Sequence, residues 1–436
     1  MSTPTKNQKE ILSKLRIDAL NPMQVDAQGA IFGNDDVILL SPTGSGKTIA
    51  YLLPLIYTLD QNCDQIQIMI IVPSRELAIQ IEQVVREMGT GYKVNAVYGG
   101  RSASKDRIEL KHLPAILIGT PGRIADHLRH ESFNTREIRS LVLDEFDKSL
   151  EVGFEKEMLE IINFLPNLRK RILTSATHGV EIPQFVGLKS PYIVDYLGEK
   201  STQLEIKTVV SPTPDKLESL KNLIYHLGNQ NGIVFCNFKD TIQIVSNYLT
   251  QNRISHGTFY GGMEQIDRER ALIKFRNGTH HVLLATDLAA RGIDVPDLDY
   301  IIHYQIPSRS EEFIHRNGRT ARMHSTGTAY IIHYVKDVLP DFIGKPPEAE
   351  LSPKELNKKS QWTTLLISGG RKDKISKGDI AGLFMKQGNL TSEELGLIEI
   401  KHDCAFIAVQ TSQIKDLLSK VSDIKLKNKK VRVTVI

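Results

Sequence analysis

Residues 41–48 decide how this chain is interpreted, and they read Ser41-Pro42-Thr43-Gly44-Ser45-Gly46-Lys47-Thr48. The apolar run before them, Val37–Leu40, has the length of a buried strand, and the residues from Lys47 onward are typical of a helix. A glycine-rich turn between strand and helix lets backbone N–H groups point at phosphate oxygens, and the helix N-terminus adds positive potential. Lys47 would reach the β and γ phosphates, and Thr48 would place its hydroxyl on Mg²⁺. The stretch therefore predicts a phosphate-binding loop.

A second segment, Asp144-Glu145-Phe146-Asp147, follows the apolar run Leu141-Val142-Leu143. Carboxylates at the end of a buried strand can hold hydrated Mg²⁺ and orient a water molecule. The strict loop pattern has glycine where this chain has Ser41, so a purely structural turn is the alternative. A structural turn has no need of Lys47, and the two segments together indicate a nucleoside triphosphatase.

The charge of the chain is unevenly distributed. The 436 residues carry a net charge of only +4, but the part from Leu351 to the end has a net charge of +7, which leaves −3 for the rest. The length predicts two to three domains. A basic tail suggests an appendage that binds a polyanion, and a solvated, solubilising face is the alternative.

The cysteines and the N-terminal residues indicate the cellular compartment in which the protein is expected. Cys63, Cys236 and Cys404 lie far apart and form neither a disulfide framework nor a zinc spacing, which favours a reducing cytoplasm. The first residues contain no apolar signal core, and no apolar run approaches membrane-spanning length. We therefore expect a cytoplasmic protein with no membrane association.

The first half of the chain alternates short apolar runs with amphipathic stretches such as Arg75–Met88 and Phe154–Leu165. This alternation predicts a parallel sheet with helices on both faces and ligands at the carboxyl ends of the strands. The predicted strands are Val37–Leu40, Ile66–Val72, Lys93–Tyr98, Ala115–Gly119, Ser140–Asp144 and Arg171–Ser175.

A polar run, Gly198–Gln203, ends this domain at residue 203, and the stretch through Pro212 and Pro214 is interpreted as a connection. A similar domain then covers residues 204–336, with helices such as Thr241–Gln251 and Gln265–Arg276. Its predicted strands are Gly232–Cys236, Ser255–Tyr260, Val282–Thr286, Tyr300–Tyr304 and Thr328–His333.

Residues 337–361 are rich in proline and charge and are predicted to be a linker with one short helix. Residues 362–436 follow a strand-helix-strand-strand-helix-strand pattern, which suggests a small α+β, RNA-recognition-like fold. The predicted elements are Trp362–Ser368, Lys377–Gln387, Leu395–Ile400, Ala405–Gln410, Ser412–Val421 and Lys430–Ile436.

Further motifs extend the pattern over residues 20–335, and together they resemble the DEAD-box RNA helicases. They are Asn21-Pro22-Met23-Gln24, Pro73-Ser74-Arg75-Glu76-Leu77, Gly99-Gly100, Thr120-Pro121-Gly122-Arg123, Ser175-Ala176-Thr177, Val234-Phe235-Cys236-Asn237, Gln265 with Arg268, Ala285-Thr286-Asp287, Ala290-Arg291-Gly292-Ile293-Asp294, and His315-Arg316-Asn317-Gly318-Arg319-Thr320-Ala321-Arg322. Phe146, Asn317 and Ala321 depart from the family pattern. The resemblance implies two RecA-like parallel-sheet domains before the C-terminal domain.

The resemblance also implies roles on the nucleotide side. Gln24 reads adenine, residues 41–48 hold the phosphates, Thr48 and Asp144 hold Mg²⁺, and Glu145 is the base or water-positioning group. Asp147 bonds the Ser175–Thr177 segment, which couples ATP to RNA, and Asp294 contacts the nucleotide. Arg316, Arg319 and Arg322 recur every three residues, so a helical turn could aim them to one side, and Arg319 and Arg322 are the arginine-finger candidates. A solvated basic helix is the alternative.

On the RNA side, loop-end glycines and arginines suit sequence-independent contact with the sugar-phosphate backbone. The resemblance assigns this role to Arg75, Gly99, Gly100, Pro121, Gly122, Arg123, Gln265, Arg268 and Thr286. Any one of these segments taken by itself is more typical of an ordinary turn.

The C-terminal segment resembles the RNA-binding domain of DbpA-type helicases. The residues that carry this resemblance are Lys377-Gly378-Asp379-Ile380 and Gly396-Leu397-Ile398. That subgroup is associated with large-subunit ribosomal RNA and its assembly. The usual aromatic stacking signature is missing, so Phe406 is predicted to be core. We instead expect RNA contacts from Arg371, Lys372, Lys374 and the run Lys425–Arg432.

These expectations combine into a monomeric, ATP- and Mg²⁺-dependent RNA helicase that acts on large-subunit ribosomal RNA. Three alternatives remain open: a general RNA helicase without a ribosomal target, a DNA translocase of the same superfamily, and an ATP-gated RNA clamp or annealing chaperone. Gln24 favours RNA over DNA, and Glu145, Arg319 and Arg322 argue against a clamp without turnover.

Overall fold

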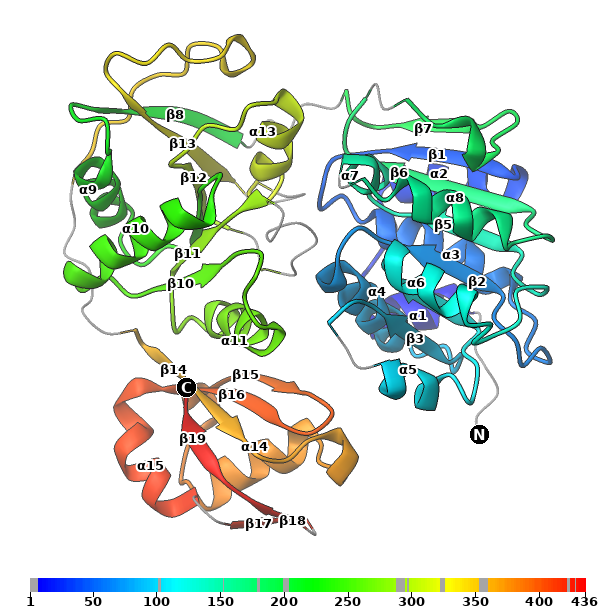
Figure 1. Cartoon of the computed structure of the whole chain (residues 1–436). Helices are drawn as coiled ribbons and strands as arrows, with labels where there is room; N and C mark the ends of the chain where they lie inside the picture. The colour runs from blue at the N-terminus through cyan, green and yellow to red at the C-terminus, as the bar shows by residue number, and fades with distance from the viewer. Residues whose placement is uncertain are drawn as a thin grey trace. The chain divides into compact units, whose positions relative to one another are not determined.

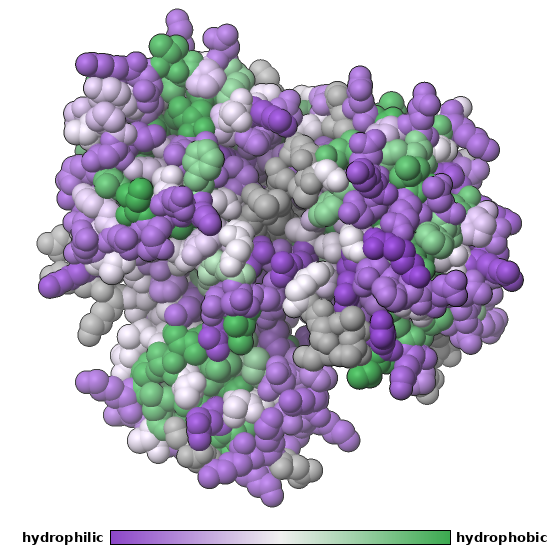
Figure 2. All heavy atoms as spheres, in the orientation of Figure 1, coloured by the Kyte–Doolittle hydropathy of each residue, from purple (hydrophilic) through white to green (hydrophobic). Residues whose placement is uncertain are grey.

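The computed structural model describes residues 7–100, 103–151, 153–178, 181–198, 204–287, 295, 298–321, 326–352, 360–421, 424–427 and 429–436. Within these ranges the chain forms two compact units, one ending by residue 198 and the other starting at residue 204. Figure 1 shows their elements, and Figure 2 shows hydrophilic side chains over most of the visible surface. No helix in the described ranges combines the length and the apolar composition needed to cross a membrane.

The first unit is a parallel sheet in the order β3-β4-β2-β5-β6-β1-β7, as far as the described residues show. Its strands are β1 (Asp36–Leu40), β2 (Ile68–Ile71), β3 (Val94–Val97), β4 (Ile116–Gly119), β5 (Ser140–Leu143), β6 (Lys170–Ser175) and β7 (Tyr192–Asp195). Its helices are α1 (Gln8–Lys14), α2 (Pro22–Gly33), α3 (Lys47–Thr58), α4 (Arg75–Glu87), α5 (Ala103–Glu109), α6 (Pro121–Arg129), α7 (Phe146–Glu151) and α8 (Glu155–Asn163).

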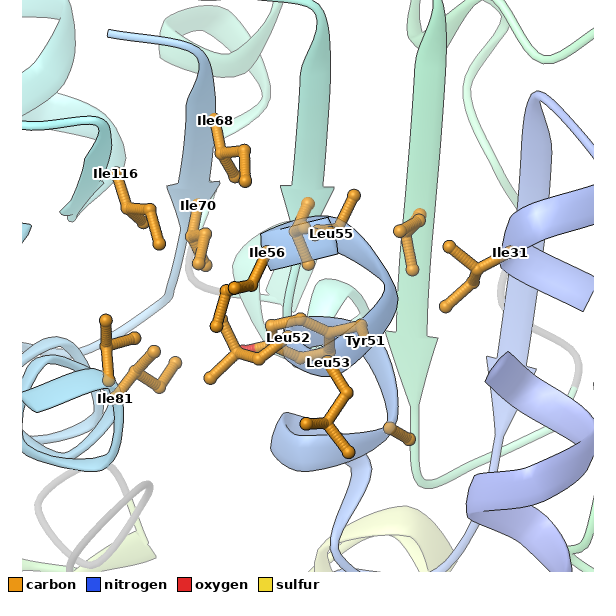
Figure 3. Close-up of a cluster of buried hydrophobic side chains, with 14 of the residues drawn as sticks. Ile31, Tyr51, Leu52, Leu53, Leu55, Ile56, Ile68, Ile70, Ile81 and Ile116 are labelled. Atoms are coloured by element: carbon orange, nitrogen blue, oxygen red, sulfur yellow. The ribbon is translucent and has the colours of Figure 1, made fainter. Parts of the chain in front are cut away.

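Both faces of this sheet are buried over β1 to β6, because successive side chains of these strands enter different cores. On β1, for example, Leu39 packs in the core shared with α3, and Ile38 packs in the core on the other face. Figure 3 shows the first of these cores, where Leu52 and Leu55 of α3 pack near the sheet. This two-sided burial explains why the strands read as continuous apolar runs and confirms the predicted parallel sheet.

The sheet order brings the motifs of the first unit together. β6 pairs with β5 on one side and with β1 on the other, in parallel register with Leu40 opposite Ser175. Three motifs therefore lie together at the carboxyl ends of these strands: the loop after β1, the carboxylates after β5 and the Ser175–Thr177 segment after β6. The edge strand β7 was not predicted, because its apolar run is only Tyr192, Ile193 and Val194, and the first two of these are exposed.

The second unit begins with another sheet, in the order β10-β11-β9-β12-β13-β8. Its strands are β8 (Leu204–Ser211), β9 (Gly232–Phe235), β10 (His256–Phe259), β11 (Val282–Ala285), β12 (Tyr300–His303) and β13 (Gly327–Tyr334). The helices described here are α9 (Leu217–Leu227), α10 (Lys239–Gln251), α11 (Gln265–Arg276) and α13 (Ser310–Asn317).

One prediction for this region was wrong, since part of the expected connection through Pro214 is strand β8. This strand pairs with β13 along its whole length, from Leu204 opposite Gly327 to Ser211 opposite Tyr334. Part of the expected linker also lies against β8: Thr208 N donates to Pro347 O at 2.9 Å, and Ala349 N donates to Thr208 O at 2.8 Å. Residues 347–349 thus pair with the edge of the sheet at Thr208.

The C-terminal region of the second unit is a small α+β domain, as predicted. Its sheet has the order β15-β16-β14-β19, formed by β14 (Trp362–Ile367), β15 (Leu395–Ile400), β16 (Ala405–Gln410) and β19 (Val433–Val435), with helices α14 (Lys377–Lys386) and α15 (Ile414–Val421). The predicted last strand, Lys430–Ile436, was wrong in extent. Its start forms β18 (Lys429–Val431), which pairs with β17 (Ile424–Leu426) in a hairpin.

The two faces of this sheet have different neighbours. Leu365 and Ile407 pack with the helices in the domain core, whereas Thr364 faces the opposite way, beyond the end of α11. Thr364 Oγ1 accepts from Asn277 Nδ2 at 3.1 Å and lies 2.7 Å from Thr279 Oγ1. The same face carries Glu399, which pairs with Arg276 at 2.5 Å, and Trp362, whose ring lies beside Gly278.

Candidate ATP and RNA sites

The phosphate-binding loop is shaped by glycines and closed by a lysine. Gly44 and Gly46 have φ values of +85° and +88°, which other residues rarely adopt. A Cβ on Gly46 would lie 2.4 Å from Gln24 Nε2, so the close approach also requires glycine. Lys47, the first residue of α3, donates from Nζ to the carbonyls of Ser41 at 2.5 Å and Pro42 at 3.0 Å. The loop therefore has the predicted strand-loop-helix geometry, with the ammonium group inside it.

Gln24 lies against this loop, on the first turn of α2. Its Nε2 donates to Gly46 O at 3.2 Å, and its Oε1 accepts from Asn21 N at 3.0 Å in a capping box. Asn21 Nδ2 in turn donates to Ser45 O at 3.0 Å. The residue predicted to read adenine is thus positioned next to the phosphate loop, with both ends of its amide engaged by the protein.

Ser41 connects the loop to the strand end of β6. Its N–H donates to Ser175 O at 3.1 Å, and its hydroxyl donates to the Ser45 hydroxyl at 2.7 Å. The serine that departs from the strict loop pattern therefore stabilises the loop. Thr43 and Thr48 are half-buried, and Gly44 is exposed at the tip.

Asp144 is held by three hydrogen bonds at the end of β5. Its Oδ1 accepts from Thr174 Oγ1 at 2.5 Å and from Glu145 N at 3.1 Å, and its Oδ2 accepts from Tyr51 OH at 2.9 Å. The carboxylate is buried, with Asp144 only 3% exposed. Neither Tyr51 nor Thr174 was predicted from the sequence. The signal for Tyr51 was its position one helical turn after Lys47, on the same face of α3.

The next residue, Glu145, has a strained backbone. Its φ is +48°, in the left-handed region that costs an L-residue about 1–2 kcal/mol. Its N–H is held by Thr174 Oγ1 at 3.1 Å as well as by Asp144. Strain of this kind persists where surrounding contacts fix it, and it occurs often at functional sites. Phe146, which departs from the family pattern, follows as a buried core residue.

Asp147 contacts the segment predicted to couple nucleotide and RNA. Its Oδ2 accepts from Thr177 Oγ1 at 3.2 Å, and Lys148 Nζ lies 3.9 Å away. Ser175 and Thr177 are joined by their own hydrogen bond, from Thr177 N to Ser175 Oγ at 3.0 Å. The acidic motif after β5 and the hydroxyl segment after β6 therefore form one connected network.

The RNA-side motifs of the first unit are also paired. Arg75 packs against Gly100, where a Cβ would lie 2.4 Å from Arg75 Nη1. Both glycines of that motif, Gly99 and Gly100, are exposed. Pro121 and Gly122 begin α6, whose N-terminal turn also carries Arg123.

Arg123 is held in place by carboxylates. Its Nε and Nη2 each lie 2.8 Å from Asp106 Oδ2, and its Nη1 lies 3.3 Å from Asp126 Oδ2. Asp106 is fully buried and also lies 3.3 Å from His127 Nε2. Arg123 is thus oriented by acidic side chains that were not predicted from the sequence.

In the second unit, Gln265 and Arg268 lie on the first turns of α11. Gln265 Nε2 donates to Glu269 Oε1 at 3.4 Å. The Arg268 guanidinium stacks over the Phe259 ring, 4.8 Å from its centroid, and Arg268 is only 8% exposed. Thr286 follows β11 and is half-buried.

The prediction that one helical turn carries both Arg316 and Arg319 was wrong. The helix α13 ends at Asn317, and Arg319 lies in the turn after it, 6% exposed. Arg316 is 1% exposed, so a solvated basic helix is wrong as well. Arg322 and Asp294 lie outside the described residues.

Arg316 instead connects several motifs of the second unit. It forms two hydrogen bonds with Asp287, at 2.6 and 2.5 Å, one with Gln305 O at 2.6 Å and one with Asn237 Oδ1 at 2.8 Å. Asn317, which departs from the family pattern, also has an internal partner, since its Oδ1 lies 3.0 Å from Nε2 of the buried His303. Burial and the nearby Arg316 charge lower the pKa of His303 to about 3.

The predicted RNA contacts of the C-terminal domain gather at one place. Arg371, Lys372 and Lys374 are exposed on and beside a short 3₁₀ turn. The β17–β18 hairpin reaches this turn, because Lys427 Nζ donates to Lys374 O at 2.8 Å and Lys429 pairs with Asp373 at 2.9 Å. Two basic segments some fifty residues apart thus form one cluster. Phe406 is 4% exposed, which confirms that it is buried, although it lies on the sheet face opposite the helix-side core.

Comparison with known proteins gives matches along most of the chain. Family profiles described as DEAD/DEAH box helicase, Helicase conserved C-terminal domain and DbpA RNA binding domain match residues 21–185, 215–324 and 364–435. The ATP-dependent RNA helicase DbpA of Escherichia coli (strain K12) is 30% identical, over 98% of this chain and 96% of that protein. The ATP-dependent RNA helicase DbpA of Bacillus subtilis (strain 168) is 28% identical, over 91% of each.

Solved structures agree on the fold. The structure of S. cerevisiae Dbp5 bound to RNA and ADP BeF3 superposes with a TM-score of 0.67 at 24% identity, covering 75% of this chain and 88% of that one. The phosphate loop, the acidic motif and the basic C-terminal domain all lie inside the matched regions. The chain belongs to the DEAD-box ATP-dependent RNA helicases of the DbpA type.

Proposed function

We propose that this helicase acts on large-subunit ribosomal RNA during ribosome assembly. The observation that carries the proposal is the basic cluster of the C-terminal domain, formed by Arg371, Lys372 and Lys374 together with the β17–β18 hairpin. A local concentration of exposed cations suits contact with the phosphate backbone of RNA. The resemblance to the DbpA-type domain supplies the ribosomal target.

In the first unit, we infer that Gln24 binds the adenine and that residues 41–48 bind the phosphates. Thr48 and Asp144 would hold Mg²⁺, and the fit is good: Asp144 is a buried carboxylate whose orientation is fixed by protein donors. Bound Mg²⁺ would neutralise charge on the β and γ phosphate oxygens. Glu145 would orient the attacking water or accept its proton.

In the second unit, we assign Arg319, with Arg322 and Asp294, to the nucleotide, and Gln265, Arg268 and Thr286 to the RNA backbone. Arg75, Gly99, Gly100, Pro121, Gly122 and Arg123 would contact RNA from the first unit. Asp147, Ser175 and Thr177 would couple the two ligands.

We also infer a cytoplasmic monomer. Cys63, Cys236 and Cys404 are all free thiols, and burial raises the pKa of Cys236 to about 12, which keeps it unreactive. Sedimentation analysis of the whole protein, with and without RNA, tests the monomer.

ATP hydrolysis with no RNA, with generic RNA and with large-subunit ribosomal RNA tests the target. We expect the ribosomal RNA to stimulate turnover most, and the double variant Arg371→Glu/Lys374→Glu to lose that preference by about tenfold or more. The matched control is Lys415→Glu/Lys420→Glu, which makes the same charge change on α15. Equal stimulation by all RNAs in the wild type would favour a general RNA helicase, and no stimulation by RNA would favour the DNA translocase or the clamp.

A further inference from the structure

Tyr51 is a polar side chain in the middle of an apolar core. It lies on α3 and is fully buried among aliphatic residues that include Leu52 and Leu55 (Figure 3). A buried hydroxyl is costly unless it finds a hydrogen-bond partner. The partner is Asp144 Oδ2, 2.9 Å from the phenol oxygen and 93 positions along the chain.

This phenol completes the set of groups that fix the Asp144 carboxylate. Thr174 Oγ1 and Glu145 N donate to Oδ1, and the Tyr51 hydroxyl donates to Oδ2. With both oxygens engaged, rotation about the Cβ–Cγ bond would break a hydrogen bond. The carboxylate is therefore held in one orientation before any ligand binds.

Tyr51 also connects the carboxylate to the phosphate loop. It lies one turn after Lys47 and Thr48 on the same face of α3. Burial, together with the charge and hydrogen bond of Asp144, raises the pKa of Tyr51 well above its usual value. The phenol thus contacts one of the two residues assigned to Mg²⁺, Asp144, from the helix that carries the other, Thr48.

We propose that Tyr51 is a positioning residue for the Mg²⁺–nucleotide site: from the helix that carries Thr48, it holds Asp144 in the orientation that the hydrated cation requires. The proposal rests on the assignment of Mg²⁺ to those two residues. Tyr51 itself contacts neither the cation nor the nucleotide. Groups of this kind, behind a metal ligand, commonly change metal affinity tenfold to a hundredfold when they are removed.

The test is the Mg²⁺ dependence of binding of a fluorescent ADP to the full-length protein. We expect Tyr51→Phe, which removes one oxygen atom, to raise the Mg²⁺ concentration for half-maximal affinity about tenfold. Nucleotide affinity in EDTA should change by less than about twofold, and the reduced ATP turnover at low Mg²⁺ should recover at high Mg²⁺. The matched control is Tyr300→Phe, because Tyr300 is as deeply buried and its hydroxyl has no hydrogen-bond partner among the described residues.

Two outcomes separate failure of this proposal from failure of the Mg²⁺ assignment. Wild-type Mg²⁺ dependence in Tyr51→Phe, with only a lower unfolding temperature, would reduce Tyr51 to a packing role. Wild-type protein that binds ADP equally with and without Mg²⁺ would instead contradict the assignment itself. Thr174→Val provides a second variant if Tyr51→Phe folds poorly. It removes the hydrogen bond to Asp144 Oδ1 and should shift the Mg²⁺ dependence in the same direction.

Discussion

Individual residues here often serve the site from behind the groups that contact ligands. Tyr51 and Thr174 orient Asp144, Asp106 orients Arg123, and Arg316 connects Asp287 to neighbouring motifs. A motif in the sequence identifies the group that meets the ligand, but the partner that holds it lies far away in the chain.

At this scale, Glu145→Gln should reduce RNA-stimulated ATP turnover by about a hundredfold or more, because the amide cannot accept a proton from water. ATP binding should be preserved, since the backbone contacts of Glu145 N to Asp144 and Thr174 do not involve the side chain. Steady-state hydrolysis measures the loss of turnover, and binding of a fluorescent nucleotide measures the preserved affinity. Turnover at the wild-type rate would remove Glu145 from the mechanism.

A second residue-scale prediction concerns Ala321, which departs from the family pattern. Its φ is +52°, a conformation that costs alanine about 1–2 kcal/mol and glycine little. Ala321→Gly should raise the free energy of unfolding by about 0.5–1 kcal/mol after the greater chain entropy of glycine is subtracted. Thermal unfolding measures this change in stability. The control is Ala329→Gly in β13, which should lower the stability of the protein.

Elements were predicted well where they are buried on both sides. The strands of the first sheet are continuous apolar runs because both faces are covered, and their ends fixed the positions of the phosphate loop and the acidic motif. The strand β8 was missed because prolines follow it, and the arginine pattern after His315 was misread because the chain leaves α13 at Asn317. Periodicity alone does not show where a helix ends, and here α13 ends with Gly318 as its C-cap residue.

The end of α11 contacts the face of the C-terminal sheet that carries Thr364, and this contact can be tested by substitution. Thr364→Val keeps the shape of the side chain but leaves Asn277 and Thr279 without their shared partner. Loss of these bonds should loosen the contact and expose Trp362, the only tryptophan of the chain, so its emission should shift to longer wavelength. Thr363→Val, on the next position and the opposite face, is the control and should leave the emission unchanged.

For the whole molecule, pH should affect the second unit through His303. Its pKa of about 3 in the folded protein lies below the ordinary value of 6.5, so the unfolded chain binds the proton more tightly. The stabilising contribution of neutral His303 to the free energy of unfolding is fully present above pH 6.5. It is lost as the pH falls, by up to about 1.4 kcal/mol per pH unit. His303→Gln should therefore weaken the pH dependence of stability between pH 6.5 and 5.

Hydrogen exchange of the β12 and β13 amides measures this stability without interference from the first unit. The variant His402→Gln replaces an exposed histidine and should behave like the wild type. An unchanged slope in His303→Gln would mean that the buried ring accepts a proton in the folded state.

The pairing of residues 347–349 with β8 has a practical consequence for the whole molecule. Since β8 is the last strand in its sheet order, Thr208 N would otherwise be an open donor on a sheet edge. Open edges of this kind recruit strands from other molecules. A chain cut after residue 336, where the apolar pattern of the second domain stops, should therefore self-associate, whereas one cut after residue 352 should stay dispersed.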